Sequence, residues 1–158
     1  MRGRASLEGI ELRDMLAEDL PQVHATENQF DSTPWSISSF SYELGNGDAI
    51  LKVAILHEQV IGYICIRSLL DITHLLKIMV LPRFRRRGIG RALLQNALHT
   101  LRDSRPDTHE LALEVRESNS AAIKLYQKAG FKETGRRPGY YRRPDEDAII
   151  MGMALSLC

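Results

Sequence analysis

The sequence predicts a single α/β domain built on a mixed, mostly antiparallel sheet of six to seven strands, flanked by about four helices. Short apolar, β-branched runs of strand length alternate with segments whose apolar residues recur at helical spacing. A length of 158 residues fits one hydrophobic core, and 44% hydrophobic with 26% charged residues is ordinary for a globular domain. We expect that domain over residues 10–158, after a flexible N-terminal extension at residues 1–9.

The first elements are expected to be a short strand and two helices. Residues 10–13 have the composition of a strand, and Ala17-Glu18-Asp19-Leu20-Pro21 opens a helix with acidic residues and a proline at its N-terminal end. A second helix is expected from Ser36 to Leu44. It stops at Gly45-Asn46-Gly47, since glycine commonly ends a helix.

Three strands follow in the middle of the chain. Residues 49–56 and 60–66 are apolar, β-branched runs joined by His57-Glu58-Gln59, which is typical of a hairpin. A further strand is expected from Ile72 to Leu81. The next element is an amphipathic helix over residues 88–103, because apolar residues recur there at helical spacing.

The last third of the chain completes the sheet. Leu111 to Arg116 is expected to be a strand, and Ser118 or Asn119 caps a helix that Gly130 ends. Residues 131–135 and 147–155 are expected to be the final strands. Between them lies Arg136-Arg137-Pro138-Gly139-Tyr140-Tyr141-Arg142-Arg143, which we interpret as an aromatic and basic loop.

The segment from Ile78 to Leu98 has the order of an anion site: apolar strand, arginine- and glycine-bearing loop, helix. The first turn of a helix leaves about four backbone N–H groups unpaired and carries roughly half a positive charge, which attracts phosphate. Gly88 and Gly90 lack a Cβ, so a diphosphate can lie directly against the backbone. The charge is supplied by Arg85, Arg86, Arg87 and Arg91.

Three other phosphate-binding motifs do not fit this segment. A P-loop ends in Gly-Lys-Ser/Thr, whereas this chain has Gly90-Arg91-Ala92. A dinucleotide fingerprint needs a third glycine where Leu93 stands. Protein kinases need several further signatures that these 158 residues do not contain. A solvated basic turn at an ordinary helix start is the alternative.

The remaining pattern, Arg85-x-x-Gly88-x-Gly90, resembles the acetyl-coenzyme A loop of the GCN5-related N-acetyltransferase (GNAT) superfamily. Further stretches resemble its RimI-like branch, the bacterial ribosomal-protein-alanine N-acetyltransferases, over nearly the whole chain. These stretches are Pro34-Trp35-Ser36, Leu113-Glu114-Val115-Arg116-Glu117-Ser118-Asn119-Ser120-Ala121-Ala122, Leu125-Tyr126, Gly130-Phe131, Tyr140-Tyr141 and Glu146-Asp147-Ala148-Ile149-Ile150-Met151.

The resemblance implies roles for individual residues. The glutamate of the Leu-Glu-Val-Arg strand, Glu114, is the implied general base, and the tyrosine of the next helix, Tyr126, is the implied general acid. It further implies that Trp35 lines the peptide entrance. Tyr140 and Tyr141 are candidate acceptor contacts, and the alternative is that their loop only shapes the groove. The implied coenzyme-binding residues are Ile78, Met79, Val80, Arg85, Arg86, Arg87, Gly88, Ile89, Gly90, Arg91 and Asn119.

Each of these residues also has a structural interpretation that the sequence leaves open. Glu114 alternates with apolar neighbours and would face solvent on a half-buried strand. Tyr126 lies on an apolar helix face and would be a core residue, and Trp35 would be a core anchor. Asn119 would serve as a helix cap in either case.

The expected reaction is direct transfer of acetyl from acetyl-CoA to a protein N-terminus, the alanine of a small-subunit ribosomal protein, without a metal. An α-amine has a pKa near 8 against about 10.4 for lysine, so its deprotonation is easier by ~3 kcal/mol. One carboxylate base suffices for such an acceptor. A broader N-terminal or small-molecule amine acetyltransferase, and an RNA- or ribosome-binding module, are the alternatives.

Composition restricts the partners and the compartment. The net charge of +1 argues against a general polyanion binder, so direct nucleic-acid binding is not expected. No apolar run approaches the roughly 20 residues of a membrane span, and no signal peptide follows Met1, so we expect a cytoplasmic protein. Cys65 and Cys158 form neither a metal-ligand spacing nor a disulfide framework.

Overall fold

A seven-stranded sheet in the order β1-β2-β3-β4-β5-β7-β6 is the centre of the computed structural model, which describes residues 7–155. Every strand pair is antiparallel except β4 with β5, as the sequence predicted for a mixed sheet. The strands are β1 (Glu11–Asp14), β2 (Ala49–Leu56), β3 (Gln59–Leu69), β4 (Ile72–Val80), β5 (Glu110–Arg116), β6 (Lys132–Tyr141) and β7 (Glu146–Ala154). The helices are α2 (Leu20–Phe30), α3 (Ile37–Leu44), α4 (Ile89–Ser104) and α5 (Ser120–Ala129), with the short 3-10 turns η1 (Ala17–Asp19) and η2 (Pro82–Phe84).

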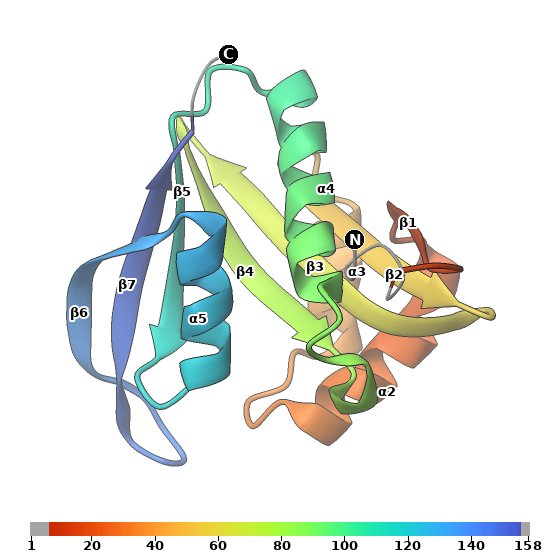
Figure 1. The fold of residues 1–158 in the computed structure, drawn as a ribbon, viewed down its shortest axis with the longest axis horizontal. Helices are drawn as coiled ribbons and strands as arrows, with labels where there is room; N and C mark the ends of the chain where they lie inside the picture. Colours follow the sequence, from red (N-terminus) through yellow and green to blue (C-terminus); the bar gives the residue numbers. More distant parts are fainter. Residues whose placement is uncertain (1–6, 156–158) are drawn as a thin grey trace.

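The helices cover both faces of the sheet. α4 and α5 lie on one face, and α2 and α3 lie on the other (Figure 1). α4 packs its apolar stripe against the sheet, and each fully buried leucine contributes about 1.5–3 kcal/mol to folding. The buried residues of that stripe are Ile89, Leu93, Leu94, Ala97, Leu98 and Leu101.

The parallel pair β4–β5 is joined along only part of its length. The paired residues are Ile72 with Glu110, Thr73 with Leu111 and His74 with Ala112. Beyond them the two strands diverge toward the end of the sheet where α4 and α5 begin (Figure 1). The carboxyl-terminal halves of β4 and β5 therefore flank an opening in the sheet.

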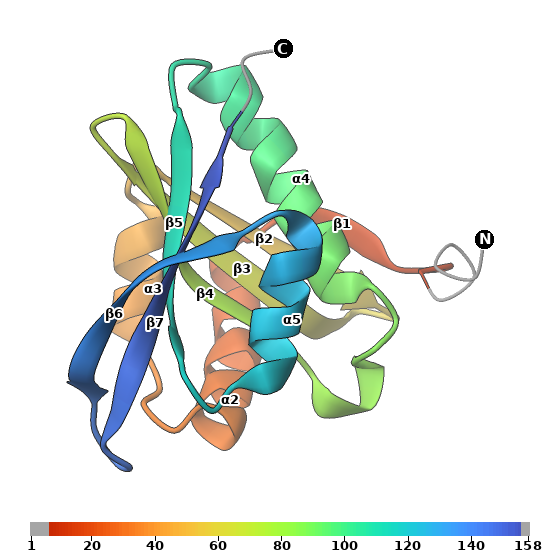
Figure 2. The ribbon, with the colours of Figure 1, turned by 60° about the vertical axis from the view of Figure 1, so that its left-hand side comes forward.

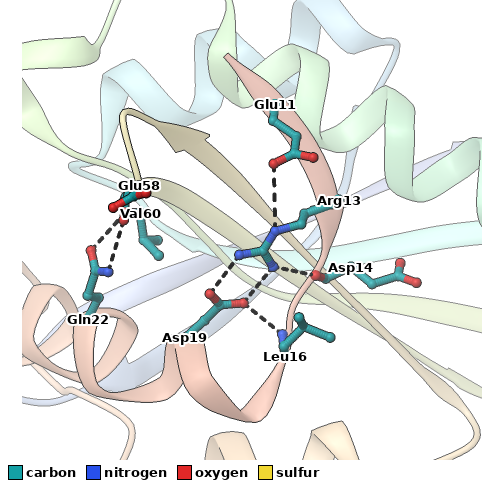
Figure 3. Close-up of polar contacts among 8 residues, drawn as sticks. All are labelled: Glu11, Arg13, Asp14, Leu16, Asp19, Gln22, Glu58 and Val60. Carbon is teal, nitrogen blue, oxygen red and sulfur yellow. Dashed lines mark hydrogen bonds and ion pairs between the residues drawn. The ribbon is translucent and has the colours of Figure 1, made fainter. Parts of the chain in front are cut away.

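The N-terminal part of the chain is fastened to the sheet by polar contacts (Figure 3). Arg13 of β1 donates two hydrogen bonds, of 2.8 and 2.9 Å, to the buried Asp19 carboxylate, and the backbone N–H of Leu16 donates a third. The bond from Arg13 is the main reason that the pKa of Asp19 lies below its usual value. Gln22 of α2 accepts a bond from the backbone N–H of Val60. α2 is thereby held against β1 and the β2–β3 turn.

One sequence prediction was wrong: residues 136–143 are not simply a loop. β6 continues to Tyr141 and pairs with β7, with Arg136 opposite Ile149 and Arg137 opposite Ala148. β6 is an edge strand, where charged side chains stay in solvent while the backbone pairs on one side. Asp147 adds to the pairing, because it accepts bonds from the Arg136 side chain and from the backbone N–H of Gly139.

The expected extension at residues 1–9 lies mostly outside the described residues, which begin at Leu7. Leu7 packs against the core cluster that also contains the buried face of α4. Within residues 7–155, no helix has both the length and the apolar character that crossing a membrane requires.

Candidate active site

The loop between β4 and α4 leaves the N-terminus of α4 without a side-chain cap. Arg86 has a φ of 65° and Gly88, the N-cap of α4, a φ of 82°, and no side chain caps the helix. The left-handed conformation of Arg86 costs of the order of 1 kcal/mol, a strain that is commonly found at functional sites. The first N–H groups of α4 are therefore left to an anion.

The two glycines of the loop serve different purposes. A Cβ at Gly88 would meet nothing within 4 Å, so the space in front of this residue is open. A Cβ at Gly90 would lie 3.2 Å from Leu125 Cδ2 and 3.7 Å from Val80 Cγ2. Gly90 is therefore needed for the close packing of α4 on α5. That both glycines free the backbone for a diphosphate stays a prediction.

The arginines of this loop differ in their contacts. Arg85 donates a 2.9 Å hydrogen bond from Nε to the Val80 carbonyl, which ties the loop to the end of β4. Arg87 lies over the ring of Phe84, 5.3 Å from its centroid. Arg86, Arg87 and Arg91 are exposed around the start of α4. Their charges surround the open N–H groups of the helix.

A second helix start lies beside the first. Asn119 is the N-cap of α5, and its Oδ1 accepts a 3.2 Å bond from the backbone N–H of Ala122. This leaves its exposed side-chain NH₂ free to donate elsewhere. α4 and α5 begin at the same end of the sheet and lie on the same face (Figures 1 and 2). Two helix N-termini thus flank the opening between β4 and β5.

Glu114 has a carboxylate oxygen without a partner. Its neighbours Leu113 and Val115 belong to the core under α4 and α5, so alternation along β5 turns Glu114 to the opposite face. Glu114 Oε1 lies 3.7 Å from Arg137 Nη2, whereas Oε2 is buried and, among the described residues, accepts no hydrogen bond. A buried acceptor without a partner is rare in native proteins, and a catalytic role is one explanation for it.

Tyr126 lies on the other face of the sheet, in the core under α5. It is 6% exposed and packs edge-on against Phe131, with ring centroids 5.7 Å apart. Burial, followed by the nearby Tyr141, raises the pKa of Tyr126, so its phenol stays protonated at neutral pH. Glu114 and Tyr126 therefore lie on opposite faces of the sheet.

The aromatic pair of β6 lies beside Glu114. The rings of Tyr140 and Tyr141 meet edge to face with centroids 5.0 Å apart. The nearby Glu114 carboxylate, then partial burial, raises the pKa of Tyr140. Burial, then the charge of Glu114, raises the pKa of Tyr141 to about 12. The structure therefore gathers both tyrosines around the expected base.

Trp35 lies on the face of α2 and α3, in the loop that joins these two helices. Its ring packs on Phe40, and the ammonium of Lys77 on β4 lies 5.6 Å from the ring centroid. Beside it is an open depression of about 290 Å³, whose lining residues are Trp35, Ser38, Ser39, Tyr42 and Glu43.

Glu27, Asp31 and Lys77 form a largely buried charge cluster next to Trp35 that the sequence patterns did not predict. The sequence contains one indication of this cluster. Glu27 lies at helical spacing from Leu20 and Val23, which places a carboxylate on the buried face of α2. Within the described part of the chain, no group of three or more His, Cys, Asp or Glu residues is arranged to hold a metal ion.

Comparison with known proteins shows the family to which the chain belongs. The sequence model of the acetyltransferase (GNAT) family matches residues 10–131. The chain is 36% identical over 142 residues to the [ribosomal protein bS18]-alanine N-acetyltransferase of Escherichia coli strain K12, covering 88% of this chain and 93% of that protein. It is 38% identical over 128 residues to an N-alpha-acetyltransferase of Sulfurisphaera tokodaii, covering 73% and 75%.

The fold agrees as well. The crystal structure of the ribosomal-protein-S18-alanine N-acetyltransferase from E. coli matches with a TM-score of 0.84 and 31% sequence identity, covering 94% of this chain and 96% of that one. The match includes the single α/β domain and the mixed seven-stranded sheet. The chain therefore belongs to the acetyltransferase (GNAT) family and is an acetyl-CoA-dependent N-acetyltransferase.

Proposed function

We propose that this protein transfers acetyl from acetyl-CoA to the α-amine of a protein N-terminus, and that its acceptor is the N-terminal alanine of ribosomal protein bS18. The observation that carries the proposal is the buried, unpartnered Glu114 oxygen beside the opening between β4 and β5. The relative from E. coli, similar over 88% of this chain, supports the choice of acceptor. A ribosomal acceptor places the reaction in the cytoplasm.

The residues of the loop fit a coenzyme that carries a diphosphate. The N–H groups at the start of α4 would bind the diphosphate in the open space before Gly88, and Arg86, Arg87 and Arg91 would neutralise it. The backbone of Ile78–Val80 and the free NH₂ of Asn119 would hold the remaining arm. Acetyl-CoA supplies the activated thioester, and no metal takes part.

Two protein groups would complete the proton transfers. Glu114 removes the proton that the acceptor amine gives up as its nitrogen bonds to the acetyl carbon. Tyr126, which its raised pKa keeps protonated, donates a proton to the sulfur as the carbon–sulfur bond breaks. Neither a covalent enzyme intermediate nor a cofactor other than the thioester is needed.

The shape of the acceptor side favours a peptide over a small molecule. The depression beside Trp35 is open, and Trp35 packs on the α2 and α3 side of the sheet, to which alternation along β5 also turns Glu114. A small amine would require an enclosed pocket to be selected. The similarity to an N-alpha-acetyltransferase favours a broader range of protein N-termini as the second candidate function.

A panel of peptides tests the proposal. Peptides that differ only in their first residue, together with one that has a blocked α-amine and an internal lysine, are incubated with the protein and acetyl-CoA. We expect one acetyl group on the α-amine, since its deprotonation is easier than that of lysine by ~3 kcal/mol. We expect the highest kcat/KM for the alanine peptide because the similar protein from E. coli is an alanine N-acetyltransferase. Transfer to lysine alone would overturn the proposed acceptor, and equal rates for all first residues would support the broader candidate.

Replacement of Gly88 by Ala is expected to weaken coenzyme binding. The new methyl group would occupy the open space where the diphosphate lies, at a φ of 82° that alanine tolerates poorly. Loss of one charged hydrogen bond corresponds to about a tenfold rise in Kd for acetyl-CoA, which isothermal titration calorimetry measures.

Gly9→Ala is the matched control. Gly9 has a φ of 79°, and its added Cβ would make only an ordinary contact with Leu56. Both variants carry the same backbone strain, but only Gly88 lies in the loop. Equal coenzyme affinity in the two variants would show that the diphosphate does not bind there.

A further inference from the structure

Glu27 is a fully buried carboxylate that three donors surround. It is 0% exposed and lies on the inner face of α2. Oε1 accepts a 2.7 Å bond from the Tyr63 hydroxyl, and Oε2 accepts a 3.0 Å bond from the backbone N–H of Trp35. Oε2 also lies 2.7 Å from Lys77 Nζ. One carboxylate thus joins α2, β3, β4 and the segment that carries Trp35.

Lys77 binds a second carboxylate at the start of the same segment. Its Nζ lies 2.6 Å from Asp31 Oδ2, and Asp31 in turn accepts a 2.8 Å bond from the backbone N–H of Thr33. Burial alone would raise the pKa of Asp31, but the hydrogen bond and the charge of Lys77 outweigh burial and lower it. The loop at residues 31–36 is therefore held at Asp31 and at Trp35 by contacts that converge on Lys77.

A β-bulge in β4 directs Lys77 toward this loop. Cys65 pairs with Lys77 and Ile66 with Leu75, so Leu76 is an additional residue without a partner on β3. Leu75 belongs to the core under α4, and regular alternation would place Lys77 on that same face. Because the bulge reverses the alternation, Lys77 faces α2 instead, where it meets Glu27.

Lys77 immediately precedes the backbone of Ile78–Val80, which we propose binds the coenzyme. Ile78 and Val80, the next residues of β4 on the α4 side, pack against the core beneath α4 and α5. The position of Lys77 is therefore fixed by the same strand that lines the opening beside β5. Its two carboxylate partners connect that strand to the loop with Trp35 on the opposite face.

We propose that Lys77 is a positioning residue that fixes the acceptor loop, residues 31–36, to the coenzyme strand β4. This inference rests on the proposed function, since it takes Trp35 to line the path of the acceptor. Without Lys77, the carboxylates of Glu27 and Asp31 would repel each other, and the loop would lose its ion pair at Asp31 and the cation beside the Trp35 ring. Trp35 would then shift relative to the acceptor, while the loop before α4, on the other face, would keep its structure.

The test compares Lys77→Met with Lys52→Met. Lys52 of β2 is a matched control, because its side chain is 10% exposed against 11% for Lys77 and its Nζ also lies 2.6 Å from a carboxylate, that of Asp14. We expect Lys77→Met to raise the KM for an alanine peptide about fivefold or more, with kcat changed far less. Lys52→Met is expected to leave that KM unchanged, and both variants should keep the wild-type Kd for acetyl-CoA.

A second variant keeps the test valid if Lys77→Met fails to fold. Asp31→Asn leaves the contact between Lys77 and Glu27 in place and removes only one charged contact of the loop. It is expected to raise the same KM by about twofold to threefold. A wild-type acceptor KM in the folded variants would overturn the inference. If the wild type acetylates only lysine side chains, the proposed function is overturned and the inference is not. The role of Lys77 is then decided by comparing the KM of the variants and of the wild type for a lysine peptide.

Discussion

Glu114→Gln is expected to lower kcat/KM for an α-amine peptide by about 10²–10⁴-fold, the range for loss of a general base. The amide keeps the size of the carboxylate but cannot accept a proton at neutral pH. Because Oε2 of Glu114 accepts no hydrogen bond from the described residues, the exchange removes little that holds the fold. Steady-state kinetics with the alanine peptide, at saturating acetyl-CoA, measure the effect.

Glu110→Gln is the control for this result. Glu110 lies four residues earlier on the same strand and on the same face as Glu114, but it is exposed and lies at the end where β4 and β5 are still paired. Its replacement should leave kcat/KM near the wild-type value. Wild-type turnover by folded Glu114→Gln would contradict the assignment of the base.

Tyr126→Phe is expected to lower kcat by about 10²-fold while the Kd for acetyl-CoA stays near the wild-type value. The variant keeps the ring that packs on Phe131 and removes only the hydroxyl that would protonate the departing sulfur. Since burial raises the pKa of Tyr126, the wild-type phenol stays neutral over the working pH range. Single-turnover measurements of acetyl transfer separate this chemical step from product release.

Tyr141→Phe distinguishes the two tyrosines that lie near each other. Tyr141 is half-buried, and its pKa is raised by burial and by Glu114, so it is a second protonated phenol close to the site. If Tyr126 is the acid, Tyr141→Phe has the smaller effect on kcat. A larger loss in Tyr141→Phe than in Tyr126→Phe would transfer the role to Tyr141.

Local sequence patterns were sufficient to predict most of the fold. The apolar stripe of α4 has a clear helical period, and glycines mark the ends of α3 and α5, so these elements were predicted within a residue or two. The hairpin of β2 and β3 was predicted at the right place. His57 and Glu58 form its turn with positive φ values, which residues of these types adopt less readily than glycine.

The remaining features depend on contacts between distant segments. The continuation of β6 to Tyr141 depends on pairing with β7, and the arginine-rich composition of the segment concealed it. The need for glycine at position 90 comes from Leu125, 35 positions away on α5.

The arrangement of the site likewise depended on the whole fold. Glu114 and Tyr126 were named from a motif, but their location on opposite faces follows from the sheet. Glu27 and Lys77 are 50 positions apart, and only the bulge at Leu76 brings them together. No local pattern reports such a contact.

The central claim is that the α-amine of bS18 receives the acetyl group, and the intact acceptor tests it most directly. Unacetylated bS18 is incubated with the protein and acetyl-CoA, and tandem mass spectrometry locates the added acetyl groups. We predict one acetyl group per bS18 chain, on the α-amine of its N-terminal alanine, and a transfer rate about 10²–10⁴-fold lower when Glu114→Gln replaces the wild type. Acetyl groups on lysine side chains, or bS18 left unmodified while other amines are acetylated, would contradict the account.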